Sequence, residues 1–170
     1  MSIYSTLDRP EAAQGILSTG LLIGLAGGLA EIAVVWSYSA LTGGDAAMVA
    51  RHVASAVGFD GGSAAAGVGV HMGLAMALGI ALSAGLQILG GRRATSGAIL
   101  SFMVGSLAVV WGINYFVVLP LVSPSFVHLL PYAVTLASKL AFGFAAAATL
   151  QMLPSFGGLS PASSNLGRRT

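Results

Sequence analysis

The chain of 170 residues contains no cysteine, and only 7% of its residues are charged. Without cysteine, the protein has no disulfide bond, no thiolate nucleophile and no Cys-ligated zinc or iron–sulfur site. A water-soluble domain carries about 25% charged residues, so this chain has too little charge to cover a soluble globule. These two shortages exclude several classes of enzyme and indicate that lipid is the main solvent.

The chain also lacks the motifs of common enzymes and of nucleic-acid-binding proteins. It has no GxxxxGK[ST] phosphate loop, no HExxH zinc motif and no GxSxG nucleophile elbow. Its net charge is only +2, and no stripe of Lys and Arg with interleaved aromatic residues occurs. A nucleic-acid partner is therefore not expected. We predict that the protein is not an enzyme, that it has no cofactor, and that the lipid bilayer is its first partner.

Apolar sequence is abundant, because 56% of the residues are hydrophobic and the mean hydropathy is +0.90. Four apolar runs occupy residues 15–41, 63–89, 97–122 and 131–153. Each exceeds the roughly 20 residues that a helix needs to cross the hydrocarbon, and none alternates like a strand. The runs predict an all-α membrane protein, a four-transmembrane-helix bundle over residues 15–153. A polar N-terminal segment, 1–14, precedes it, and a disordered Gly/Ser/Pro-rich tail, 154–170, follows.

The longest linker, residues 42–62, has a helical pattern of its own. Asp45 suits an N-cap and Gly58 suits a helix end. One face of this segment is apolar, and it carries Val49, Val53 and Val57. The pattern predicts a short amphipathic helix lying at the membrane interface between the first two spans.

The arginines predict the orientation of the chain. With four crossings, the N-terminus, the turn between the second and third spans and the tail share one side of the membrane. That side holds five arginines and the other side holds only Arg51. The five are Arg9, Arg92, Arg93, Arg168 and Arg169. The positive-inside rule then places both termini in the cytoplasm, and we expect the bacterial plasma (inner) membrane.

Each span carries one strongly polar side chain well inside it, at about the same depth. These residues are Glu31, His71, Asn114 and Lys139, in chain order. Counted from the nearer ends of the spans, they lie roughly 8–15 Å below the same face at about 1.5 Å rise per residue. Charges at mid-bilayer are costly, so such groups usually face the bundle and pair with one another. We therefore predict one intramembrane polar cluster in the outer half of the bundle.

This cluster has two interpretations. Glu31 and Lys139 could form a structural ion pair that fixes helix register, with His71 and Asn114 supplying its remaining hydrogen bonds. Alternatively, the carboxylate, the imidazole and the amine form a proton, ion or ligand site, because intramembrane ionisable groups commonly mark pathways.

Small residues predict where the helices pack. Glycines at four-residue spacing let helix backbones approach closely. The predicted packing positions are Gly20, Gly24, Gly28, Gly69, Gly73 and Gly143.

Metal and cofactor sites have little support in the sequence. Thioether and imidazole side chains suit Cu(I), and the only candidates are Met48 with His52 and Met72 with Met76. Methionine in an apolar helix is more often a space filler, so we predict no metal. A bis-histidine heme would need a second histidine beside His71, and a quinone headgroup could lie only near His128 and Tyr132.

Together these features predict a small polytopic membrane protein. The leading hypothesis is a non-catalytic accessory or oligomerising component of a membrane assembly, either a homo-oligomer or part of a larger complex. The alternative is a small proton-, ion- or metal-translocating protein that uses the Glu/His/Lys cluster.

Overall fold

The computed structural model describes residues 9–59, 61–89 and 94–153. These residues form only helices and connecting turns, with no strand among them. In order, the elements are α1 (Arg9–Thr42), α2 (Ala46–Ala56), α3 (Ala64–Leu89), α4 (Ser96–Ile113), the π-helix η2 (Asn114–Val118), α5 (Leu119–Val122), the 3-10 helix η3 (Pro124–His128) and α6 (Tyr132–Met152). Helix α1 begins at Arg9, so part of the predicted segment 1–14 is helical. The predicted tail, 154–170, lies outside the described residues.

Four of these stretches are long and apolar enough to cross a membrane. They cover Ala13–Thr42, Ala64–Leu89, Ser96–Val122 and Tyr132–Met152. The all-helical class and the predicted four helices long and apolar enough to span a membrane are therefore confirmed, and the fold is compatible with a small integral membrane protein. Arg92, Arg93, Arg168 and Arg169 lie outside the described residues, so the orientation stays a prediction.

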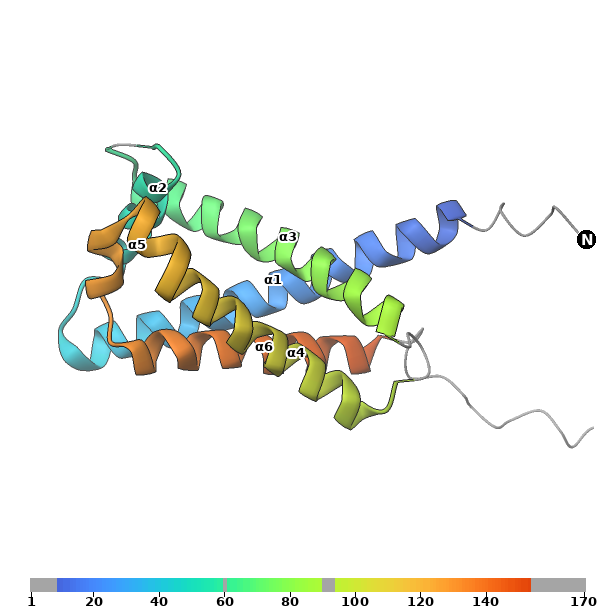
Figure 1. Cartoon of the computed structure of the whole chain (residues 1–170). Helices are drawn as coiled ribbons and strands as arrows, with labels where there is room; N and C mark the ends of the chain where they lie inside the picture. Colours follow the sequence, from blue (N-terminus) through green and yellow to red (C-terminus); the bar gives the residue numbers. More distant parts are fainter. Residues whose placement is uncertain (1–8, 60, 90–93, 154–170) are drawn as a thin grey trace, which may run out of the picture.

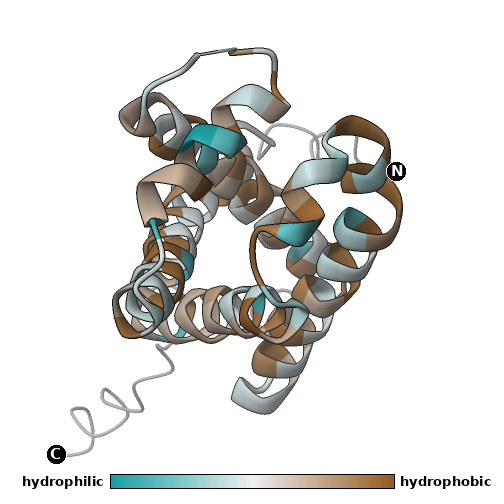
Figure 2. Cartoon of the chain, turned by 90° about the vertical axis from the view of Figure 1, so that its left-hand side faces the viewer, coloured by the Kyte–Doolittle hydropathy of each residue, from teal (hydrophilic) through white to brown (hydrophobic). Residues whose placement is uncertain are grey.

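The long helices lie side by side along one axis (Figure 1). Helix α1 packs against both α3 and α6, and α4 packs against α6. Helices α2 and α5 lie at one end of the bundle, called the α2 end below. The opposite end, where α1 begins and α6 ends, is called the terminal end. Viewed from the α2 end, the helices surround a common centre (Figure 2).

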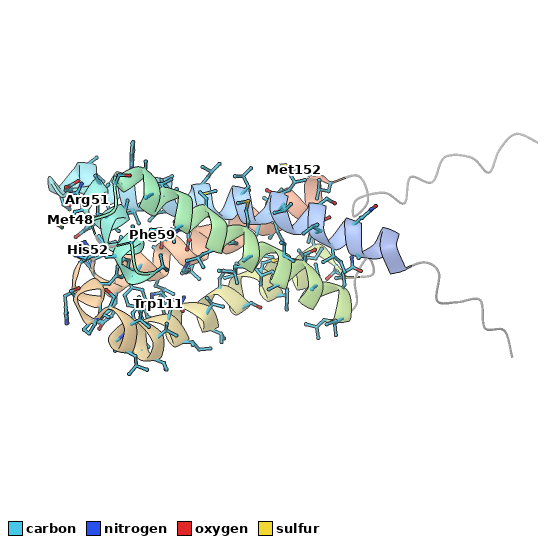
Figure 3. All side chains as sticks on the ribbon, turned by 90° about the horizontal axis from the view of Figure 1, so that it is seen from above. Met48, Arg51, His52, Phe59, Trp111 and Met152 are labelled. Carbon is cyan, nitrogen blue, oxygen red and sulfur yellow. The ribbon has the colours of Figure 1, made fainter. Side chains whose placement is uncertain are left out.

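Helices α3 and α4 touch each other little. They lie close at the terminal end, where Gly85 is next to the Phe102 ring, and diverge toward the α2 end (Figure 3). The terminal half of the bundle is filled by a core of buried apolar side chains. This core includes Ile23, Leu82, Leu86, Met103, Leu107, Phe142 and Leu150. The bundle is therefore closed at the terminal end and wider at the α2 end.

Glycine lets α1 and α3 pack with their backbones in contact. A Cβ atom on Gly20 would lie 2.5 Å from Ile80 Cα, and one on Gly24 would lie 2.5 Å from the Ala75 carbonyl oxygen. A Cβ on Gly28 would lie 2.8 Å from the Ala75 Cβ. Between α6 and α4, a Cβ atom on Gly143 would lie 2.9 Å from Val104 Cα. These four glycines lie at helix contacts.

Gly69 and Gly73 are different. A Cβ atom on either would meet no other atom within 4 Å. The predicted packing role of these two glycines is therefore wrong for contacts within this chain. The physical reason is that they lie on a face of α3 turned away from its neighbouring helices.

Helix α2 has the predicted boundaries. The Asp45 carboxylate accepts a hydrogen bond from the Ala47 N–H at 2.8 Å, and it also pairs with Arg51 at 2.9 Å. The hydrogen bond from Arg51 lowers the pKa of Asp45, so the cap stays ionised at neutral pH. The helix ends at Ala56, and Gly58 adopts φ +89° just beyond it, as a glycine after a helix end commonly does.

The third span is less regular than the predicted continuous helix over residues 97–122. It consists of α4, the π-helix η2 and the short α5. Pro120 lies at the start of α5 and has no N–H to donate. In a continuous α-helix its ring would also clash with the Phe116 carbonyl. A π-turn just before this proline is a common way to absorb such a defect in a helix.

The two kinds of glycine give a direct test of the α1–α3 contact. We expect Gly24→Ala to destabilise the protein by about 1–3 kcal/mol, because the new methyl group forces two backbones apart. Gly73→Ala, on the open face of α3, is the matched control and should not reduce stability. Thermal unfolding in mild detergent measures both. Equal effects of the two substitutions would contradict the packing described here.

Candidate functional site

A buried ion pair joins α1 to α6. The Lys139 ammonium lies 2.6 Å from Glu31 Oε1, and Glu31 is only 4% exposed. Apart from this contact, Oε1 has no hydrogen-bond partner among the described residues. A charge removed from water in this way is tolerated only when an opposite charge compensates it. Glu31 therefore depends on Lys139.

His71 of α3 completes the group. Its Nε2 atom lies 3.5 Å from Glu31 Oε2 and 3.3 Å from the Gly28 carbonyl oxygen. When Nε2 carries a proton, it can donate to either oxygen. Gly28 thus has two functions, since it has no side chain to separate α1 from α3 and it offers a carbonyl group to the imidazole. The structure brings Glu31, His71 and Lys139 together from three helices.

Asn114 lies at the junction of α4 and η2. It makes no side-chain hydrogen bond to the three charged or titratable groups among the contacts of the described residues. However, it lines the same cavity as they do. The structure therefore places Asn114 beside the cluster and not within its contacts.

A cavity of about 530 Å³ lies at the α2 end of the bundle. The six α-helices, the π-helix η2 and the 3-10 helix η3 all contribute residues to its wall. Most wall residues are aliphatic, and they include Val49 and Val53 of α2 and Val57 just after it. Its polar side chains include the four residues predicted from the sequence, with Tyr115, Thr135 and Ser138. The apolar face of α2 thus lines this cavity.

The three groups of the cluster are not equally accessible from the cavity. The Glu31 side chain is 5% exposed, whereas those of Lys139 and His71 are 21% and 24% exposed. The carboxylate therefore lies behind the ammonium and the imidazole. The Lys139 ammonium and the His71 imidazole are therefore more accessible than the Glu31 carboxylate, which also lines the cavity, and the net charge of the cluster is zero when His71 is neutral.

A group of aromatic rings from α4, η2 and α6 lies beside the cluster. Trp111 stacks on Tyr115 with ring centroids 5.7 Å apart, and its Nε1–H donates to Thr135 Oγ1 at 3.0 Å. Tyr132 meets the same rings edge-on. Sequence reasoning missed Tyr115 as a wall residue. Its position next to Asn114, and four residues after Trp111, could have indicated it.

The residues considered for metal binding mostly make ordinary helix contacts. His52 and Met48 lie together on α2 (Figure 3), where His52 Nδ1 is 2.9 Å from the Met48 carbonyl oxygen. The Met72 sulfur packs toward Gly28. Among the described residues, no group of three or more His, Cys, Asp or Glu side chains could hold a metal ion. His128 lies exposed in η3 and is not among the residues that line the cavity.

No protein family, curated protein or solved structure matches this chain. The function must therefore be inferred from the cluster and its cavity.

The charge pair gives a second prediction. Glu31→Gln should destabilise the fold by up to about 3–5 kcal/mol, because it leaves the Lys139 ammonium without its counter-charge. Adding Lys139→Met should restore most of this loss. Thermal unfolding in mild detergent measures the three proteins.

The exposed pair on α2 supplies the control. Asp45→Asn with Arg51→Met removes an ion pair that is about half exposed and keeps a good N-cap residue, so the change should stay within about 1 kcal/mol. If Glu31→Gln alone is as stable as the wild type, Glu31 and Lys139 do not depend on each other as described.

Proposed function

We propose that this chain is a small integral membrane protein that binds a small ligand in the cavity at the α2 end and exchanges protons at its Glu31–His71–Lys139 cluster. The observation that carries this proposal is that the cavity wall contains every Asp, Glu, Lys, Arg and His residue of the four candidate spans, namely Glu31, His71 and Lys139. Pockets of about 300–1,000 Å³ with a few convergent polar groups are typical ligand sites. Histidine is the side chain best suited to exchange protons near neutral pH.

The cluster can be reached from one end of the bundle, which supports a translocating protein whose site is open to one side of the membrane. The cavity lies at the α2 end, and the buried core fills the terminal half. A protein that moves a ligand or proton across the membrane must expose its site to one side at a time. The geometry matches one such state, in which the site is open toward the α2 end.

The orientation follows from the arginines. We propose that both termini are cytoplasmic in a bacterial plasma membrane, because the N-terminal segment, the turn between the second and third spans and the tail together carry five of the six arginines of the sequence. The cavity then opens toward the outer face, and α2 lies at the outer interface above the bundle.

A second candidate function is the accessory or oligomerising component. One observation favours it, namely that the Glu31–Lys139 pair is complete within one chain. Such a pair can fix the register of α1 against α6 without any turnover. In this case the protein is not an enzyme, and its partners are lipid and either further copies of itself or a larger membrane complex.

The orientation is tested by a reporter. A green fluorescent protein fused to the C-terminus should fluoresce in bacterial cells, and an alkaline phosphatase fused there should be inactive. A phosphatase inserted next to Gly61, in the loop after α2, is the matched control and should be active. The reverse pattern would place the cavity on the cytoplasmic side.

Proton exchange is tested in liposomes that contain a pH-sensitive dye. With the membrane potential clamped, wild-type protein should dissipate an imposed pH gradient faster than protein-free vesicles do. The Glu31→Gln/Lys139→Met protein, which should fold, should lose this effect. The Asp45→Asn/Arg51→Met protein should retain it. A wild-type rate equal to that of protein-free vesicles would reject proton exchange, and a stoichiometric partner in mild-detergent purification would then favour the accessory function.

A further inference from the structure

The cavity has two chemically different regions. Its wall is mainly aliphatic, with side chains such as Val53 on α2, Leu74 and Leu78 on α3, and Val110 on α4. Its polar region is the cluster of Glu31, His71 and Lys139. A ligand that fills such a space gains from burying apolar surface and needs a polar group only at one end. A cavity with an aliphatic wall and one polar end suits an amphiphile better than a hydrophilic solute or an ion.

The side of the bundle between α3 and α4 offers a path to this cavity. The two helices diverge toward the α2 end (Figure 3). Leu74 on α3 and Val118 on η2 both line the cavity, and they are 58% and 40% exposed. The cavity wall on this side is therefore apolar and accessible. A molecule with an alkyl chain could enter here directly from the hydrocarbon.

The side chains that the cluster exposes to the cavity favour one charge for the polar head of an amphiphile. Lys139 and His71 face the cavity, and the Glu31 carboxylate lies behind them. An ammonium has three N–H donors, and the described residues give Lys139 one carboxylate partner. An anionic head would gain charge-assisted hydrogen bonds from these two groups. A cationic head would meet the ammonium first and be repelled.

We infer that the cavity binds a single-chain amphiphile with a carboxylate head, such as a fatty acid, with the carboxylate at Lys139 and His71 and the alkyl chain toward the opening between α3 and α4. This inference rests on the proposed function, since it names the ligand class of the same site. The aliphatic wall accounts for the chain, and the order of the three side chains accounts for the charge of the head.

The absence of cysteine makes a labelling test straightforward. A single cysteine is introduced as Val53→Cys, on the cavity face of α2, in the full chain held in zwitterionic lipid nanodiscs. Ser55→Cys, on the exposed part of the same helix and outside the cavity wall, is the matched control. The rate of reaction with a maleimide is measured with increasing decanoate. Decanol and decylamine, which have the same chain and other heads, are the comparison ligands.

We expect decanoate to slow labelling at Val53→Cys several-fold and saturably, with no effect at Ser55→Cys. Decanol and decylamine should protect much less. In the Glu31→Gln/Lys139→Met background the advantage of decanoate over decanol should disappear, while unchanged labelling at Ser55→Cys reports that α2 is still folded. Equal protection by all three ligands, protection at both positions, or no protection by decanoate would each overturn the inference.

The labelling assay and the liposome assay test the two proposals separately, so either proposal can be rejected without the other. Proton flux without selective protection by decanoate would leave the proposed function standing and remove the carboxylate amphiphile as its ligand. Selective protection without proton flux would keep the binding site and reject proton exchange across the membrane.

Discussion

The rest of the structure depends on one ion pair between apolar helices, in which Glu31 and Lys139 compensate each other's charge. Glu31 is almost completely buried, and Lys139 is the charge that makes this burial tolerable. The pair joins α1 to α6. His71 can approach it because Gly28 lets α3 come close to α1. Three helices therefore meet at these charges, which form the polar end of the cavity.

Side-chain size explains why one half of the bundle is closed and the other is open. At the α1–α3 contact, glycine and alanine bring the backbones together. Toward the α2 end, the bulky rings of Trp111, Tyr115 and Tyr132 pack against one another. Helix α2 lies over this wider end and packs on α3 where Gly67 meets the Ala50 backbone. The cavity is the space that remains below it.

The sequence predicts the parts of this structure that depend on local pattern. Length and hydropathy predict the four long helices, and the residues Asp45 and Gly58 predict the ends of α2. The common height of the polar residues predicts that Glu31, His71 and Lys139 meet. The divergence of α3 and α4 is set by tertiary packing, so no local signal indicates the cavity. Gly73 likewise has the same spacing pattern as Gly24, and only the position of neighbouring helices distinguishes them.

The divergence of α3 and α4 has a consequence for the surrounding lipid. A bundle that widens toward one end displaces more area in one leaflet of a bilayer than in the other. Closing the gap would reduce that difference, and widening it would increase it. In a bilayer, any change in the separation of α3 and α4 would therefore do work against lateral pressure, and the host membrane would act on the cavity without any direct contact with Glu31, His71 or Lys139.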